Sequence, residues 1–284
     1  MTVHRTERVF VLAVVLFVGL GLTLAVSRGV FSQGGVLAPL IWLLAAMLML
    51  VAAAGAYWLR SGLRTAPATT LPHAFLPLIK LPSDVLIPGT LVAGFTIFLQ
   101  LFDSALIQTL VLALAGASFA AVYWAQAHAV DWEDRYFGLA QLALNIASHL
   151  TAFLFFSVIY GLKVRALYSA TAVGIVASLL VYEMLSRDAI WHRAMNMPVQ
   201  GKRSTLALLS VSCGLVAGEI TWGLNYWAAL STLVGGAFLL LVFYVIYGLV
   251  SHYVNDSFSR AILVEFAAVG VIGVLVIFLS AFYS

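Results

Sequence analysis

Charged residues are scarce in this chain. Lysine, arginine, aspartate and glutamate together make up 9% of its 284 residues, whereas an ordinary soluble domain carries roughly 25%. Hydrophobic residues make up 63%, and a soluble core cannot bury so much apolar surface. The shortage of charge therefore excludes a soluble globular protein. It predicts an all-α fold, a polytopic transmembrane helical bundle with the lipid bilayer as its solvent.

Cysteine is almost absent as well. The single Cys213 lies in an apolar run, so no intramolecular disulfide can form, and we expect it to act as a small core residue. The net charge of +3 does not indicate a nucleic-acid partner. The basic residues lie in short loops between apolar runs and form no basic face with interleaved aromatic residues.

Motifs for catalysis and cofactor binding are also missing. Lys80, Lys163 and Lys202 all fall in loops, which excludes a retinal Schiff base inside a span. His149 alone lies near the middle of an apolar run, so a haem held by two histidines is not expected. The chain contains no H-E-x-x-H, P-loop or G-x-S-x-G motif. We therefore predict no cofactor and no metal site, and the sequence leans away from an enzyme.

Long apolar runs dominate what is present, and a spanning helix needs about 20 such residues. The candidate spans are 9–27, 37–59, 86–102, 105–127, 137–162, 166–185, 204–223, 228–250 and 261–283. The first exceeds the apolar core of about 7–15 residues in a signal peptide, so we interpret it as a helix. The third is short and contains Pro88. The pair over 86–127 either crosses twice, giving nine spans, or is re-entrant, giving eight.

Basic residues favour nine spans with a cytoplasmic N-terminus, because cytoplasmic loops are enriched in lysine and arginine. In that topology only Arg28, Lys163 and Arg165 lie outside. The eleven inside are Arg5, Arg8, Arg60, Arg64, Lys80, Arg135, Arg187, Arg193, Lys202, Arg203 and Arg260. With one crossing removed, the division becomes seven against seven.

The loops are too short for a soluble domain, so we predict a single integral membrane domain over 1–284. The longest loop, 60–85, is predicted to be cytoplasmic and to lie along the membrane surface. It carries four prolines at five-residue spacing, which prevent a continuous helix. A partner-docking role for this loop is an alternative to a plain connector.

Three acidic residues have simple structural interpretations. Glu183 lies four residues before Arg187, the spacing of a salt bridge on one helix face. Glu265 lies near the start of the last span, where an acidic residue suits the helix dipole. Asp103 falls in the turn between the third and fourth spans, where a short acceptor can cap a helix.

Glu219 is different, because it lies about five residues inside the end of its span with no cation within a turn in sequence. It is a candidate proton- or cation-responsive carboxylate, or a bonding group for a partner helix or ligand. A structural hydrogen-bond anchor is the alternative. Ser210, Gly214 and Gly218 recur at four-residue spacing on the same span, which predicts close packing against another helix.

A second polar feature is the stripe of Gln141, Asn145 and His149, spaced every four residues and therefore on one helix face. Such a stripe must face protein or water. It predicts either interhelical hydrogen bonds or a proton-relay or ligand-binding role for His149. We further hypothesise that the stripe and Glu219 meet in one cavity.

The run Gly218-Glu219-Ile220-Thr221-Trp222-Gly223-Leu224-Asn225-Tyr226-Trp227 resembles a segment of an uncharacterised family of bacterial multi-pass membrane proteins. Two later segments, Phe243–Leu249 and Leu263–Phe266, fit the same resemblance. It covers the C-terminal third of the chain. The resemblance implies a location in the bacterial inner membrane and implies no activity.

Three function classes follow. The first is a non-catalytic membrane subunit or assembly factor, which would bind other membrane subunits or form a homo-oligomer. The second is a proton-coupled or small-solute transporter using Glu219 and the polar stripe. The third is a lipid-modifying membrane enzyme. The lack of catalytic motifs and the short loops favour the first.

Overall fold

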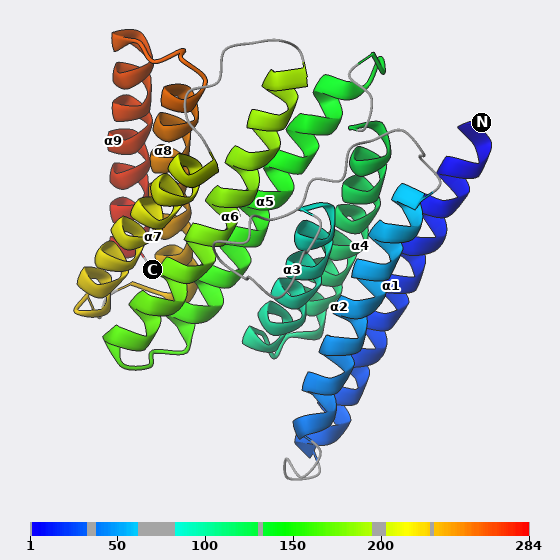
Figure 1. The fold of residues 1–284 in the computed structure, drawn as a ribbon. Coiled ribbons are helices and arrows are strands. Elements are labelled where there is room, and N and C mark those ends of the chain that lie inside the picture. Colours follow the sequence, from blue (N-terminus) through cyan, green and yellow to red (C-terminus); the bar gives the residue numbers. More distant parts are fainter. Residues whose placement is uncertain are drawn as a thin grey trace. The chain divides into compact units, whose positions relative to one another are not determined.

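The chain folds almost entirely into α-helices in the computed structural model (Figure 1). The structure describes residues 2–32, 38–61, 83–129, 133–194, 203–227 and 230–283. Within these ranges the chain forms nine α-helices, one short 3-10 helix and no strand. They are α1 (Thr2–Ser32), α2 (Ala38–Ser61), α3 (Ser83–Phe98), η1 (Leu99–Leu101), α4 (Ala105–His128), α5 (Phe137–Gly161), α6 (Ala166–Ala194), α7 (Arg203–Asn225), α8 (Thr232–Val254) and α9 (Arg260–Tyr283). The predicted all-α class is confirmed.

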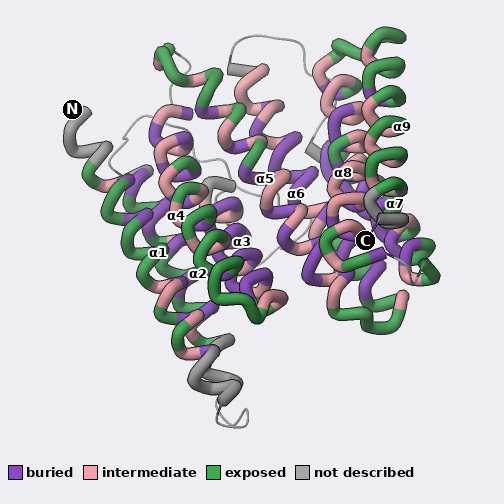
Figure 2. The backbone as a smooth tube through the Cα atoms, turned by 180° about the vertical axis from the view of Figure 1, so that it is seen from behind, coloured by how far each residue is buried: buried purple, intermediate pink, exposed green. Residues whose placement is uncertain are grey.

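Seven of these helices are long and apolar enough to cross a membrane: α1 and α4 to α9. Within the described residues, α2 and α3 with η1 contribute the apolar helical stretches Leu43–Leu59 and Val85–Leu101. Many large apolar residues along the helices are exposed, as expected where lipid is the solvent. Figure 2 colours all exposed positions green along the backbone. The crossing number of nine and the cytoplasmic N-terminus stay predictions.

The helices form two compact units. The first comprises residues 1–70 and 81–151, and the second comprises 71–80 and 152–284. The division falls within α5, which contributes its first part to one unit and its last part to the other. The predicted single domain over 1–284 stays a prediction. Most of the predicted interfacial loop 60–85 lies outside the described residues.

Small residues let the helices of the first unit approach closely. Gly55 of α2 lies against the side chain of Leu12 in α1. The buried Tyr123 of α4 donates its hydroxyl proton to the carbonyl oxygen of Ala52 at 3.0 Å. Phe95 and Phe119 meet edge to face with ring centroids 5.9 Å apart. Packing and one buried hydrogen bond therefore hold α1 to α4 together, as expected for helices in lipid.

The second unit uses the same device around the last part of α5. Tyr160 lies against Gly235 of α8, and Ser157 lies against Gly236. A Cβ atom on either glycine would collide with the facing residue of α5. The Tyr160 hydroxyl lies 3.4 Å from the carbonyl oxygen of Leu224, at the end of α7. The end of α5 is thus fixed to both α7 and α8.

α9 is the least covered of the apolar helices. Only 6% of the residues in its apolar stretch are buried, against 28–56% in the other six long helices. It contacts α8 through two interlocking positions, with Phe266 against Gly248 and Leu241 against Gly273. Figure 2 shows α9 green along most of its length.

Helix bounds depart most from the predicted spans in α1 and α6. The predicted span 9–27 lies within α1, which runs from Thr2 to Ser32, and the predicted span 166–185 lies within α6, which continues to Ala194. Charged residues near 187 lower the local hydropathy and set the predicted end of the span in α6. Those charged residues are bonded within the second unit, as described below.

Candidate functional site

The backbones of α6 and α7 touch at three glycines. A Cβ atom on Gly214 would collide with the Ser178 hydroxyl and the carbonyl oxygen of Gly174. A Cβ atom on Gly218 would lie 2.9 Å from the carbonyl oxygen of Ala170. No side chain larger than hydrogen fits at these points without a shift. Ser210, the third small residue of the predicted packing face, is fully buried, and its hydroxyl donates to the carbonyl oxygen of Leu206 at 2.7 Å.

A groove of about 490 Å³ runs along the line where α6 and α7 meet. Thirteen residues line it, all from these two helices: Leu167, Ala170, Thr171, Gly174, Ile175, Ser178, Leu179, Val211, Gly214, Leu215, Gly218, Glu219 and Trp222. The volume lies in the range of small-molecule pockets, about 300–1,000 Å³. The walls are almost wholly apolar, so the groove suits an apolar or amphipathic occupant.

Glu219 is exposed in this groove. It forms no hydrogen bond or ion pair with the residues that the structure describes. Its neighbour Trp222 donates its indole N–H to the Tyr226 hydroxyl at 3.1 Å, and both rings are exposed. The predicted carboxylate therefore lies on the surface of the second unit, one residue from the Gly218 contact.

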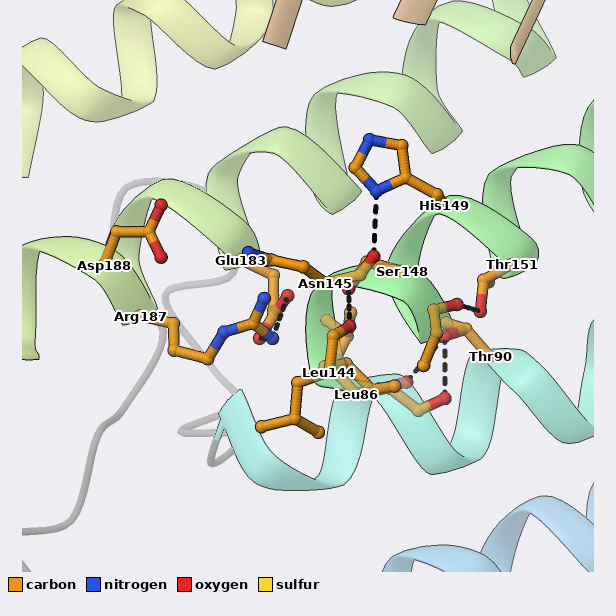
Figure 3. A network of polar contacts seen from close by, with 12 residues as sticks. Leu86, Thr90, Leu144, Asn145, Ser148, His149, Thr151, Glu183, Arg187 and Asp188 are labelled. Atoms are coloured by element: carbon orange, nitrogen blue, oxygen red, sulfur yellow. Dashed lines mark hydrogen bonds and ion pairs between the residues drawn. The ribbon is translucent and has the colours of Figure 1, made fainter. Parts of the chain in front are cut away.

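The opposite end of α6 holds a buried ion pair. The Arg187 guanidinium donates to both carboxylate oxygens of Glu183, at 3.0 and 3.3 Å (Figure 3). Glu183 is 1% exposed and Arg187 is 8% exposed. The salt bridge predicted from the four-residue spacing is confirmed. Removing either partner would break a buried ion pair, which is strongly destabilising.

Asp188, which sequence reasoning missed, extends this polar region to α8. Its carboxylate accepts the Tyr247 hydroxyl proton at 2.9 Å and lies 3.4 Å from the Ser251 hydroxyl. Asn255 donates to Ser251 at 3.4 Å. The two contacts of Asp188 connect residues 59 and 63 positions apart, so no local spacing signals them. The available signal was an aspartate next to Arg187, just past the expected end of the span.

The predicted polar stripe lies on α5 in the first unit. Gln141, Asn145 and His149 are all half-buried. The Nδ1 atom of His149 lies 2.8 Å from the Asn145 carbonyl oxygen (Figure 3). A carbonyl oxygen only accepts, so Nδ1 carries the proton and the imidazole is bonded within its own helix. Glu219 belongs to the second unit, and the hypothesis of one shared cavity stays a prediction.

The described residues of the α4–α5 connection make several polar and aromatic contacts. His128 Nδ1 lies 2.8 Å from the Asp134 carboxylate, which also accepts the backbone N–H of Tyr136 at 2.9 Å. Trp124 packs against the His128 ring with centroids 4.9 Å apart. Asp134 therefore links the end of α4 to the start of α5.

Two other structural expectations can be compared with the structure. The N-cap of α4 is Ser104 rather than Asp103, and it forms no side-chain cap bond. Instead, Gln108 donates to the carbonyl oxygen of Phe102 at 2.6 Å. Glu265 is exposed, one turn into α9. Across the described residues, no three histidine, cysteine, aspartate or glutamate side chains are grouped as metal ligands.

The fold and these sites define the class: a helical protein with seven helices able to cross a membrane, with one groove-facing carboxylate and one buried charged cluster. The chain belongs to a family described as protein of unknown function (DUF5656), which matches residues 25–280. The expectation of an uncharacterised family is confirmed, and the match extends far beyond the C-terminal third. The bacterial, multi-pass character of that family stays a prediction. No curated protein and no solved structure matches the chain.

Proposed function

We propose that this protein is a non-catalytic subunit or assembly factor of the bacterial inner membrane, with its N-terminus in the cytoplasm. In this proposal α9 binds a transmembrane helix of a partner membrane protein. The observation that carries it is that only 6% of the residues in the apolar stretch of α9 are buried, far fewer than in the other long helices. Helices associate in lipid mainly through close packing, and within the second unit α9 has such packing only on the side that faces α8.

One exposed face of α9 suits a partner helix. Ala261, Glu265, Ala268 and Ile272 are all exposed, and their spacing of i, i+4, i+7 and i+11 places them on one face. The two alanines permit a close backbone approach, and the carboxylate offers an interhelical hydrogen bond. A face built only for lipid needs neither feature.

The test is purification from native membranes in mild detergent, followed by native mass spectrometry. We expect the wild-type chain to carry a different membrane protein in fixed stoichiometry. Ala268→Trp should reduce that partner at least tenfold by blocking close approach. Ala267→Trp is the matched control, because it is also exposed but points about 100° away around the helix. Equal loss in both variants, or a chain that purifies alone, would contradict the proposal.

The buried charged cluster favours a second candidate function, a proton-coupled or small-solute transporter. Glu183, Arg187 and Asp188 lie inside α6, and Asp188 is bonded to α8. Ionisable groups at membrane depth commonly mark proton or substrate paths. In proteoliposomes this reading predicts that Asp188→Asn abolishes solute flux driven by a pH gradient while the protein stays folded. Flux that persists in the variant would reject the role of Asp188.

A further inference from the structure

We propose that the groove between α6 and α7 binds a phospholipid with a primary ammonium headgroup, and that the Glu219 carboxylate pairs with the ammonium. This site is separate from the face of α9 and independent of any partner protein. Charge, depth and size each contribute to the assignment.

The polar groups of the groove leave one unused bonding position. Thr171 and Ser178 donate their hydroxyl protons to carbonyl oxygens of their own helix, Leu167 and Gly174, both at 2.8 Å. Glu219 is the only charged lining residue, and it has no bonding partner in the described part of the chain. An apolar groove with one carboxylate complements a ligand that is apolar along its length and cationic at one end.

The depth of Glu219 matches a headgroup. α7 ends at Asn225, so Glu219 lies about 9 Å inside that end at 1.5 Å per residue. The exposed pair Trp222 and Tyr226 lies on the same stretch. Such amphipathic rings concentrate at headgroup level. An ammonium bonded to Glu219 would therefore lie close to the depth at which lipid headgroups already reside.

The rest of the groove continues from Glu219 toward the middle of the bilayer. On α7 it is lined by Leu215 and Val211, and on α6 by Ile175 and Leu179. These residues succeed one another at four-residue intervals, one turn apart. The apolar walls thus run along the direction in which an acyl chain extends from its headgroup.

Size favours an acyl chain over a helix as the occupant of the groove. A helix with its side chains is about 10–12 Å across, so a 20 Å length occupies roughly 1,600 Å³ or more, several times the groove volume of about 490 Å³. A whole phospholipid is also larger than the groove, but a single acyl chain is narrow enough to lie along it while the rest of the lipid stays in the bilayer. The glycines that would admit a third backbone are already closed by the α6–α7 contact. The negative carboxylate also disfavours anionic headgroups.

The experiment uses delipidated full-length protein and nanodiscs containing equal amounts of phosphatidylethanolamine and phosphatidylglycerol. Native mass spectrometry after release from the nanodiscs measures which lipid stays bound. We expect at least a tenfold preference for phosphatidylethanolamine, as one charge-assisted contact can provide. Glu219→Gln should abolish that preference. Glu133→Gln, which neutralises an exposed glutamate outside both the groove and α9, should retain it.

A second variant tests the apolar part of the site. Leu215→Trp fills the groove while leaving Glu219 in place, and it should reduce bound phosphatidylethanolamine by a similar factor. Three outcomes would overturn the proposal: no preference in the wild type, the same preference in Glu219→Gln, or a second protein chain in place of lipid that leaves when Glu219 is changed. Because neither groove variant alters α9, failure here is distinguishable from failure of the subunit proposal.

Discussion

Acidic side chains at the two ends of α6 differ in whether they have a bonding partner within the protein. Near its C-terminal end, Glu183 is paired with Arg187. Asp188 accepts a hydrogen bond from Tyr247 of α8, so both carboxylates have partners inside the second unit. Near its N-terminal end, α6 and α7 form a groove in which Glu219 is exposed and has no partner among the described residues. The charges at one end are bonded within the unit, whereas the carboxylate exposed in the apolar groove is available to a group from outside.

The largest effect should come from breaking the internal pair. Arg187→Met removes the guanidinium bonded to the buried Glu183 carboxylate, and breaking a buried ion pair in this way should destabilise the protein by about 3–5 kcal/mol. Unfolding in mixed micelles with increasing sodium dodecyl sulfate measures the change. The double variant Glu183→Gln/Arg187→Met should recover most of the loss, since it removes both charges. A single variant as stable as the wild type would show that the pair does not hold α6 in place.

The link from α6 to α8 should give the next largest effect. Tyr247→Phe removes the hydroxyl that donates to Asp188 and should cost about 1.5–3 kcal/mol, the range for hydrogen bonds to charged groups. Tyr253→Phe is the control, because Tyr253 lies on the same helix and is 52% exposed. The same unfolding titration compares the two. If both substitutions have equal effects, the Asp188 contact contributes nothing specific.

The glycine contact beneath the groove should be sensitive to one methyl group. Gly214→Ala places a Cβ atom against Ser178 and Gly174 and should destabilise the protein by about 1–3 kcal/mol. Gly223→Ala on the same helix meets nothing within 4 Å and should be neutral or stabilising by up to about 1 kcal/mol. Thermal unfolding in detergent distinguishes them. A Gly214 variant that matches the Gly223 variant would argue against close backbone contact.

Glu219 should give the smallest change in stability. Glu219→Gln breaks no bond within the described residues, so the free energy of unfolding should change by less than about 0.5 kcal/mol. Measured beside Arg187→Met, it tests directly whether the two ends of α6 differ. A loss of several kcal/mol would mean that Glu219 has an internal structural partner and would remove the contrast.

Local features were predictable from the sequence because their partners are near in the chain. The apolar runs gave the helices, and the four-residue spacing gave the Glu183–Arg187 pair. The regular spacing of Gly214 and Gly218 drew attention to the helix face that lies against α6. Each of these depends on the helical repeat alone.

Features that depend on another helix were not predictable in this way. The partner of Asp188 is Tyr247, 59 positions later. The exposure of Glu219 depends on which part of α7 faces α6, and a helical repeat gives the faces without saying what covers them. The predicted span also stopped at 185, before the end of α6 at Ala194. Hydropathy does not distinguish a charged side chain bonded inside the protein from one exposed to water.

The glycine contacts between α6 and α7 also have a consequence for motion in the second unit. At Gly214 and Gly218 no side chain separates the two backbones, so a shift of one helix against the other cannot be taken up by rotamer changes there. We therefore expect α6 and α7 to move together and the groove between them to keep its shape. We expect larger displacements for α9, of which only 6% is buried.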